Sequence, residues 1–220
     1  MVAVLIPAYD AADTLPELLR RSRTFVEPRD TVVIDDGSSD PTGARALEAG
    51  VNVLRHPRNR GKGAALRTGF EFVRSSTRYD AAITMDADLQ HCPEELPEFL
   101  KARAERGSSI VIGYRSRLGT GMPFHRILSN TITSALVAAR TGVAIKDSQS
   151  GFRLIGREVL DAISFQSDGY EAETELLIKS ALRGFRIDFI PIATVYGGER
   201  SHMTHWDTTR KFLQVLLRDY

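Results

Sequence analysis

The sequence predicts an α/β protein, a single domain built on a mainly parallel, twisted sheet with helices on its faces. Short β-branched and apolar runs alternate with amphipathic segments of helical period through the first half, which is the pattern of βαβ units. Of the 220 residues, 42% are hydrophobic and 26% charged, a composition typical of globular proteins. No repeat or linker-like stretch divides the chain, so we predict one domain over residues 1–220.

Five strands and four helices are expected in the first half. The strands are apolar runs bounded by turn residues, at 2–6, 31–35, 51–54, 81–85 and 109–113. The helices carry apolar residues at helical spacing, over 14–26, 42–49, 61–75 and 93–106. Asp13 is the expected N-cap of the first helix, and Asp40 that of the second, with Pro41 at its first position. The crossovers between parallel strands should be right-handed.

The second half of the chain is less regular. Helices are expected over 124–140, 158–163, 170–183 and 207–220. Residues 185–195 read as one or two strands interrupted by Pro191, because proline cannot donate to a sheet.

Charge and composition argue against several classes of protein. The formal net charge is +1, so a nucleic-acid-binding protein is not expected. Cys92 is the only cysteine, which excludes an intrachain disulfide and favours a reducing compartment. The N-terminus lacks a secretory pattern, and no apolar run approaches the ~20 residues of a membrane span. We therefore expect a cytoplasmic protein.

Asp86 and Asp88 are the most informative residues of the sequence. They follow an expected strand at positions i and i+2, which project to one face of an extended backbone. The carboxyl ends of such strands are where open α/β sheets bind ligands. Two adjacent carboxylates repel unless a cation lies between them, and hard oxygen ligands suit Mg²⁺ or Mn²⁺ completed by substrate phosphates. The alternative is a pair of solvated acids in a turn.

Two other polar segments follow strands of the first half. Asp36 ends the second strand, where its carboxylate can accept hydrogen bonds from a nucleobase or a ribose, whereas Asp40 is better explained as a turn and cap residue. Residues 59–65 open a helix with Asn-Arg-Gly-Lys-Gly-Ala-Ala. Small residues there let a ligand approach the backbone, and a helix N-terminus favours phosphate. The spacing is neither that of a P-loop nor that of a dinucleotide fingerprint, so this signal is weak on its own.

The second half carries candidate groups for an anionic ligand. Arg115 and Arg126 flank a Gly-rich loop over 119–123, and arginine binds phosphate through two parallel hydrogen bonds. Solvated surface arginines are the alternative. Asp147 stands in a polar turn and could act as a base or a positioning group. Acids also begin the helix after residue 170, where the helix dipole already favours them.

Taken in order, these segments resemble glycosyltransferase family 2 of the GT-A fold, especially the dolichyl- or polyprenyl-phosphate mannosyltransferases and their soluble bacterial relatives. The matching segments span nearly the whole chain. They are Ile-Pro-Ala-Tyr at 6–9, Val-Ile-Asp-Asp-Gly-Ser-Ser-Asp at 33–40, Asn-Arg-Gly-Lys-Gly at 59–63, Met-Asp-Ala-Asp-Leu-Gln-His at 85–91 (a DxD motif), Ile-Gly-Tyr-Arg at 112–115, Asp-Ser-Gln-Ser-Gly-Phe-Arg at 147–153, and Glu-Thr-Glu-Leu-Leu at 173–177.

The resemblance implies an inverting, Mg²⁺- or Mn²⁺-dependent transfer of a hexose from a nucleotide-sugar donor, such as GDP-mannose or UDP-glucose, to a polyprenyl phosphate or another acceptor. Residues 1–113 would form the donor half and 114–220 the acceptor half. The implied donor-binding residues are Pro7, Tyr9, Asp36, Lys62, Asp86 and Asp88; the metal ligands are Asp86, Asp88 and Gln90; the acceptor-binding residues are Arg115, Arg126 and Ser129; and the reaction centre is formed by Asp147, Gln149 and Glu173.

Two other functions stay open at this point. A sugar-phosphate nucleotidylyltransferase would share the fold and the metal, but it normally has a Gly-rich signature after the first strand, where Pro7-Ala8-Tyr9 stands here. A non-catalytic nucleotide-sugar-binding subunit is the other alternative. For that case, the apolar face of residues 212–217 could dock on another chain or peripherally on a membrane, or it could pack on its own core.

Overall fold

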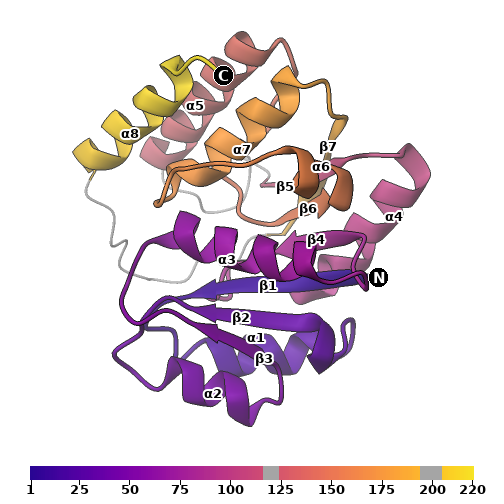
Figure 1. Cartoon of the computed structure of the whole chain (residues 1–220). Coiled ribbons are helices and arrows are strands. Elements are labelled where there is room, and N and C mark those ends of the chain that lie inside the picture. The colour runs from indigo at the N-terminus through magenta and orange to yellow at the C-terminus, as the bar shows by residue number, and fades with distance from the viewer. Residues whose placement is uncertain (116–123, 194–204) are drawn as a thin grey trace.

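The computed structural model describes residues 1–115, 124–193 and 205–220, without the side chains of 124–126 and 205–207. The described residues form one seven-stranded sheet in the order β3-β2-β1-β4-β6-β5-β7 (Figure 1). Its strands are β1 (Val2–Ala8), β2 (Thr31–Asp35), β3 (Asn52–Arg55), β4 (Ala81–Thr84), β5 (Ile110–Arg115), β6 (Arg153–Gly156) and β7 (Ile187–Ile192). β6 is antiparallel to both of its neighbours, and every other pairing is parallel.

Helices cover both faces of this sheet. One face packs against α1 (Leu15–Ser22), α2 (Thr42–Glu48) and α4 (Leu96–Arg106). The other packs against α3 (Lys62–Ser75), α5 (Phe124–Thr141), α6 (Arg157–Ala162), α7 (Glu171–Leu182) and α8 (His205–Leu217), of which α5, α7 and α8 form a group in Figure 1. Two short 3₁₀ helices, η1 (Pro28–Asp30) and η2 (Pro93–Glu95), complete the connections. The predicted single-domain α/β fold is confirmed.

The strand sequences explain how one sheet serves two cores. Successive side chains of a strand point to opposite faces, so a strand covered on both sides must be apolar at every position. In β1, Leu5 is buried in the core under α3, and its neighbours Val4 and Ile6 are buried in the core under α1. In β2, Ile34 is buried in the core under α3, and its neighbour Val33 is buried in the core under α1.

The predicted elements of the first half are all present, with their bounds shifted by a few residues. Two details of the helix starts are wrong. α1 begins at Leu15 with Thr14 at the N-cap, not Asp13, and no side chain caps it. α2 begins at Thr42, the start of the predicted range, but its N-cap is Pro41 and not Asp40. The Asp40 carboxylate accepts hydrogen bonds from the Thr42 and Ala12 amides at 3.0 and 2.9 Å. The expected turn role of Asp40 is therefore confirmed.

The second half differs from the prediction in two strands. Pro191 does not interrupt the last one, because β7 runs through it at the edge of the sheet, where a missing N–H donor is tolerated. β6 was not predicted at all. Only two of its four residues, Leu154 and Ile155, are apolar, so its sequence lacks the apolar run that identified the other short strands.

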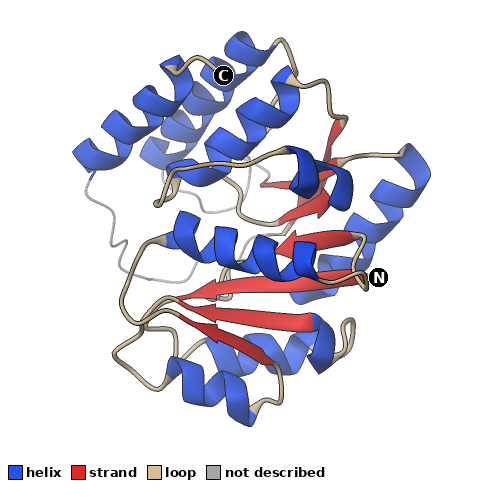
Figure 2. Ribbon diagram, viewed as in Figure 1, coloured by secondary structure: helices blue, strands red, loops and turns tan. Residues whose placement is uncertain are grey.

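The reversed direction of β6 builds the functional edge of the sheet (Figure 2). Its first residue, Arg153, pairs with Thr84 at the carboxyl end of β4 and with Ile112 in the middle of β5. The turn before β6, residues 147–152, is thereby delivered to the edge where the parallel strands end. Residues from both halves of the chain meet there.

The described helices include none with the length and hydropathy needed to cross a bilayer. On α8, Phe212, Val215 and Leu216 are buried in the core, which is the packing role considered for residues 212–217. Leu213 and Leu217 of the same helix are exposed.

Candidate active site

Asp86 and Asp88 lie where the sequence places them, on one face just beyond β4. Both side chains are partly exposed, whereas Met85 before them and Ala87 between them are buried. A turn follows, in which Leu89 has a positive φ of 62° and the Gln90 amide donates to Asp88 Oδ1 at 3.0 Å. The buried His91 ring accepts a hydrogen bond from the Asp86 amide at 3.1 Å through Nδ1. Hydrogen bonds to Asp88 and His91 thus hold the backbone of residues 86–90.

Lys62, at the start of α3, reaches this segment. Its Nζ lies 2.6 Å from Asp86 Oδ1 and 3.2 Å from Glu173 Oε2, and it stands 5.7 Å from the centre of the Tyr170 ring. One ammonium therefore bridges carboxylates from β4 and α7. These three charged residues come from three separate parts of the chain, and all three were named from the sequence.

Burial and neighbouring charges have opposite effects on the pKa values of Lys62 and Asp86. Burial disfavours the ammonium, but the attraction of Asp86 and Glu173 outweighs it and raises the pKa of Lys62 above its ordinary value. Burial likewise works against the Asp86 carboxylate, and the charges of Lys62 and Arg115 outweigh that effect and lower its pKa. Burial lowers the pKa of His91 to about 4, so its ring is neutral at pH 7. The site holds a charged pair and a neutral imidazole.

Gly151 lets the second half approach this pair. A Cβ built on it would lie 2.8 Å from Asp86 Oδ2 and 2.9 Å from Lys62 Nζ, closer than any side chain allows. Two polar atoms beside this contact are buried without a hydrogen-bond partner among the described residues, Ser150 Oγ and Glu173 Oε1. Buried polar atoms are normally satisfied, so these two leave hydrogen-bonding capacity unused beside Asp86 and Lys62.

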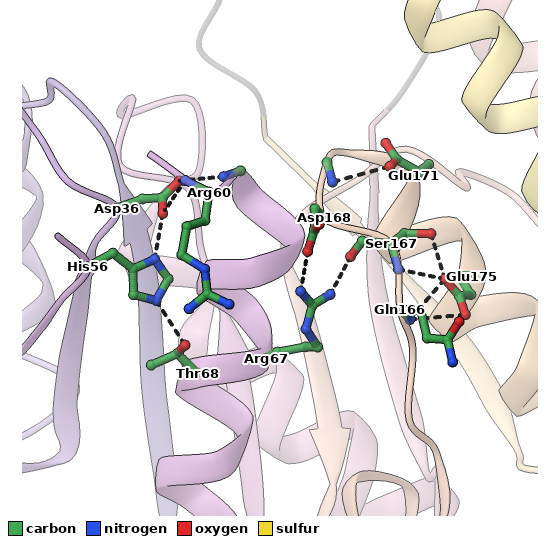
Figure 3. Close-up of polar contacts among 12 residues, drawn as sticks. Asp36, His56, Arg60, Arg67, Thr68, Gln166, Ser167, Asp168, Glu171 and Glu175 are labelled. Atoms are coloured by element: carbon green, nitrogen blue, oxygen red, sulfur yellow. Dashed lines mark hydrogen bonds and ion pairs between the residues drawn. The ribbon is translucent and has the colours of Figure 1, made fainter. Parts of the chain in front are cut away.

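The Gly-rich start of α3 has a different role from the one expected of it. The amides of Gly63 and Ala64 donate to the Asp168 carbonyl at 2.7 and 3.3 Å, and a Cβ on Gly61 or Gly63 would collide with the carbonyl of residue 168 or 167. Arg67 binds the same segment through the Ser167 carbonyl and the Asp168 carboxylate (Figure 3). The glycines allow residues 167 and 168 to pack closely against the start of α3. The amides at this helix N-terminus are bound by a backbone carbonyl rather than left open for phosphate.

The Asp36 carboxylate is also hydrogen-bonded by groups of the protein itself. Its buried carboxylate accepts hydrogen bonds from the Arg60 amide at 3.0 and 3.1 Å and from the Gly61 amide at 2.7 Å. His56 bridges Asp36 Oδ1 at 2.6 Å and Thr68 Oγ1 at 2.9 Å (Figure 3). Asp36 thereby fixes the two residues that precede Lys62.

Asp147 and Arg115 form the second charged group at this edge. Asp147 is 1% exposed, and Arg115 binds it from the end of β5 with Nε 2.9 Å from Oδ2. The Gln149 amide donates to Asp147 Oδ1 at 3.0 Å, and the Gln149 side chain is exposed. Burial acts to raise the pKa of Asp147, but Arg115 outweighs it and holds the pKa below the ordinary value.

Arg153 is a site residue whose role the sequence did not show. It is 2% exposed, and its guanidinium donates to the carbonyls of Ser150, Glu173 and Ser148 at 2.6, 2.7 and 2.8 Å. It therefore ties the turn before β6 to the first turn of α7. Tyr170, whose ring faces Lys62, was also missed. An arginine in a predicted turn gives no sign that it will be buried.

The remaining candidates lie elsewhere on the described residues or outside them. Pro7 is the next-to-last residue of β1, at the same edge and beyond the pairing of β1 with β4, and Tyr9 follows β1 with 50% exposure. Ser129 is exposed on α5. The loop over 119–123 and the side chain of Arg126 lie outside the described residues.

The donor set at Asp86, Asp88 and Gln90 fits a hard divalent cation. It offers two carboxylates and one amide oxygen, and Mg²⁺ sites commonly use one or two carboxylates with waters and substrate phosphates. No group of three His, Cys, Asp or Glu side chains placed to hold a metal occurs within the described ranges. The protein alone therefore supplies part of a coordination shell, and a phosphate ligand would complete it.

Residues 3–164 match the family described as Glycosyl transferase family 2. The chain belongs to this family. It is 34% identical over 205 residues to an undecaprenyl-phosphate mannosyltransferase of Micrococcus luteus, covering 88% of this chain and 83% of the relative. It is 32% identical over 202 residues to a polyprenol monophosphomannose synthase of Mycolicibacterium smegmatis, covering 86% and 75%.

A solved crystal structure has the same fold. The crystal structure of glucosyl-3-phosphoglycerate synthase from Mycobacterium tuberculosis, in complex with Mn²⁺, UDP and glucosyl-3-phosphoglycerate, superposes with a TM-score of 0.75 at 21% identity. The match covers 99% of this chain and 78% of that one. The family 2 chain is thus a glycosyltransferase with the predicted GT-A architecture.

Proposed function

We propose that this glycosyltransferase moves a hexose from a nucleoside-diphosphate sugar to a polyprenyl phosphate, with Mg²⁺ or Mn²⁺ held by Asp86, Asp88 and Gln90. The observation that carries the proposal is the position of the two aspartates. They share one face at the carboxyl edge of the sheet, beside a buried lysine and two unsatisfied polar atoms. The acceptor class is supported by the two relatives whose names specify polyprenyl-phosphate or polyprenol substrates.

The first half of the chain supplies the donor side. Pro7 and Tyr9 at the end of β1 would contact the nucleoside, and Asp36 would frame that position by holding the loop that leads to Lys62. A bound cation would offset the charge that develops on the departing diphosphate. Lys62 adds a second positive charge close to the same point.

The second half of the chain would hold the acceptor and the reacting carbon. Arg115 lies at the end of β5, where a guanidinium can bind a phosphate through two hydrogen bonds, and Arg126 and Ser129 are proposed beside it. An acceptor phosphate is ionised at neutral pH and needs no strong base to attack the anomeric carbon from the face opposite the leaving group. In this proposal Glu173 Oε1, which is buried without a hydrogen-bond partner, would accept a hydrogen bond from the sugar, and the exposed Gln149 side chain would accept or donate one.

We also propose that the protein works peripherally at the cytoplasmic face of a membrane. On α5, Leu128, Ile132 and Leu136 recur every fourth residue and are 49%, 50% and 39% exposed, and exposed Leu213 and Leu217 on α8 add to the apolar area. A lipid-linked acceptor would be reached from such a surface. Co-sedimentation with vesicles should weaken in Ile132→Ser, and Leu47→Ser, which alters an even more exposed leucine on α2, should have no effect.

The experiment that tests the function is a thermal-shift screen followed by transfer. GDP-, UDP- and dTDP-sugars with Mn²⁺ should include one that raises the melting temperature, because a ligand of the folded state stabilises it. That donor should then yield a nucleoside diphosphate and a glycosylated undecaprenyl phosphate. Release of pyrophosphate from a nucleoside triphosphate and a sugar phosphate would instead indicate a nucleotidylyltransferase. Donor binding without turnover would indicate a binding subunit.

A further inference from the structure

Lys62 occupies a position that helix energetics alone disfavour. It is the first residue of α3, at the positive end of the helix dipole, and the first turn contains no acidic residue. Its side chain is only 14% exposed. A buried lysine at this point is stabilised by the carboxylates that it meets, Asp86 and Glu173, and not by its own helix.

The main chain of Lys62 is held from both sides. The Asp36 carboxylate binds the amides of Arg60 and Gly61 before it, and the Asp168 carbonyl binds those of Gly63 and Ala64 after it. Because Asp168 lies three residues before the start of α7, the same contacts hold Lys62 close to Glu173. The ammonium is therefore directed at the two carboxylates by a rigid frame, while its flexible side chain still allows it to change partners.

We propose that Lys62 is a built-in competitor of the divalent cation for Asp86, with Glu173 as the second partner to which its ammonium is transferred when the cation binds. This inference rests on the proposed metal role of Asp86. The geometry that supports it is the unequal bridge, with Nζ 2.6 Å from Asp86 Oδ1 and 3.2 Å from Glu173 Oε2. Two cations cannot share one carboxylate at close range without repulsion, so ion entry must weaken the shorter contact.

This arrangement ties metal binding to the donor. A metal ion alone must displace Lys62 from Asp86, whereas a metal ion arriving with a diphosphate brings negative charge that the displaced ammonium can neutralise. Lys62 would thus suppress metal binding without nucleotide and favour the metal–nucleotide complex. Glu173 holds the ammonium close to the diphosphate position, so its buried carboxylate acts on the metal through Lys62.

The test is Mn²⁺ binding measured without nucleotide, by calorimetry or by the electron paramagnetic resonance signal of free Mn²⁺. Lys62→Met should bind Mn²⁺ at least ~10-fold more tightly than the wild type, since the competing charge is gone, and its melting temperature should fall and recover on adding Mn²⁺. Lys62→Arg keeps the charge and should not show the tighter binding. Lys179→Met is the matched control, because Lys179 pairs with buried Glu175 at 2.7 Å, also on α7, and its loss should leave Mn²⁺ affinity unchanged.

Glu173→Gln gives a prediction of opposite sign. Without its second partner the ammonium stays on Asp86, so Mn²⁺ affinity should fall. In Lys62→Met/Glu173→Gln the affinity should equal that of Lys62→Met, because Glu173 then has nothing to act through. An additive loss in the double variant, or unchanged Mn²⁺ affinity in Lys62→Met, would overturn the inference. If the wild type still transfers sugar with Mn²⁺ in that case, the proposed function stands and only the role of Lys62 fails.

Discussion

Arg115 and Asp147 form a two-point ion pair at the end of β5, with Nε 2.9 Å from Oδ2 and Nη2 3.2 Å from Oδ1. The Asp147 side chain is almost fully buried and the Arg115 side chain is 19% exposed. Asp147 is therefore kept ionised by the residue proposed to bind the acceptor phosphate. An acceptor phosphate that takes up the exposed side of Arg115 would be positioned by a guanidinium already fixed from behind.

Replacing Arg115 should reveal the cost of burying Asp147 alone. Arg115→Met is expected to lose about 3 kcal/mol of unfolding free energy at pH 7, because it leaves a buried charge without its partner. The low pKa of Asp147 stabilises the wild type above the unfolded value of 3.8, and this contribution is lost as the pH falls through the folded pKa. In the variant, burial raises the pKa of Asp147, so the difference between the two proteins should shrink from pH 7 towards pH 4.5. Urea unfolding at both pH values measures this.

Asp147→Asn added to Arg115→Met serves as the control for that experiment. The neutral amide needs no counter-ion, so it should recover part of the lost stability at pH 7 and remove most of the pH dependence. An Arg115→Met variant that is as stable as the wild type at pH 7 would mean that the ion pair contributes nothing to stability.

Arg153 should matter more to stability than any surface arginine. Arg153→Met removes three hydrogen bonds from a charged donor and leaves the carbonyls of Ser148, Ser150 and Glu173 without that partner, so a loss of about 3 kcal/mol or more is expected. Arg153→Lys retains the charge but cannot reach all three carbonyls and should recover only part. Arg20→Met removes an exposed pair with Glu17 and should change the melting temperature little.

Gly151→Ala should affect the site more than the fold. Its Cβ would press on the Asp86 carboxylate and the end of the Lys62 side chain, which can move aside at modest cost to stability. Displacing them should lower Mn²⁺–nucleotide affinity by about 10- to 100-fold, the range seen for groups that orient metal ligands. Gly43→Ala is the control, since its Cβ would lie 2.6 Å from Asp35 Oδ2, a buried carboxylate on β2. Gly43→Ala should destabilise the protein without comparable loss of metal affinity, and equal effects of the two variants would contradict this account.

Gly63→Ala tests whether the Gly-rich start of α3 packs against the chain. The new Cβ would lie 2.4 Å from the Ser167 carbonyl and 2.7 Å from Ala172 Cβ, so a loss of about 1–3 kcal/mol is expected. Gly69→Ala on the same helix would meet only the ends of Ile34 and Leu5, at 3.1 Å, and should be nearly neutral or stabilising. Chemical denaturation compares them directly. Two variants of equal stability would show that the close approach at Gly63 is unimportant.

The fold was predictable because the strands of the first half are apolar enough for their own sequences to indicate that they are buried. Runs such as 31–35 are apolar or β-branched at nearly every position, which specifies a strand covered on both faces. β6 could not be found this way, since Arg153–Gly156 begins with an arginine and ends with a glycine, and its burial comes from its place between β4 and β5. Pro191 was read as a break because its place at an edge is a property of the whole sheet.

The site was predictable as a set of residues but not as a set of contacts. The Asp-x-Asp spacing places Asp86 and Asp88 on one face, since that relation is local. The pairing of Lys62 with Asp86 and Glu173 depends on how three elements pack, and no local pattern contains it. The glycines of residues 59–65 look the same in sequence whether a phosphate or the Asp168 carbonyl fills the helix end. The division into donor and acceptor halves stays a prediction.

The central claim is most directly tested by transfer of a labelled hexose from its nucleotide donor to undecaprenyl phosphate, with Mn²⁺ or with excess EDTA, in the wild type and in Asp88→Asn. The account predicts glycolipid formation by the wild type with Mn²⁺, no product in EDTA, and a rate at least ~100-fold lower in Asp88→Asn, because the charge on the leaving diphosphate is no longer offset. Undiminished transfer in EDTA together with full activity of Asp88→Asn would contradict it.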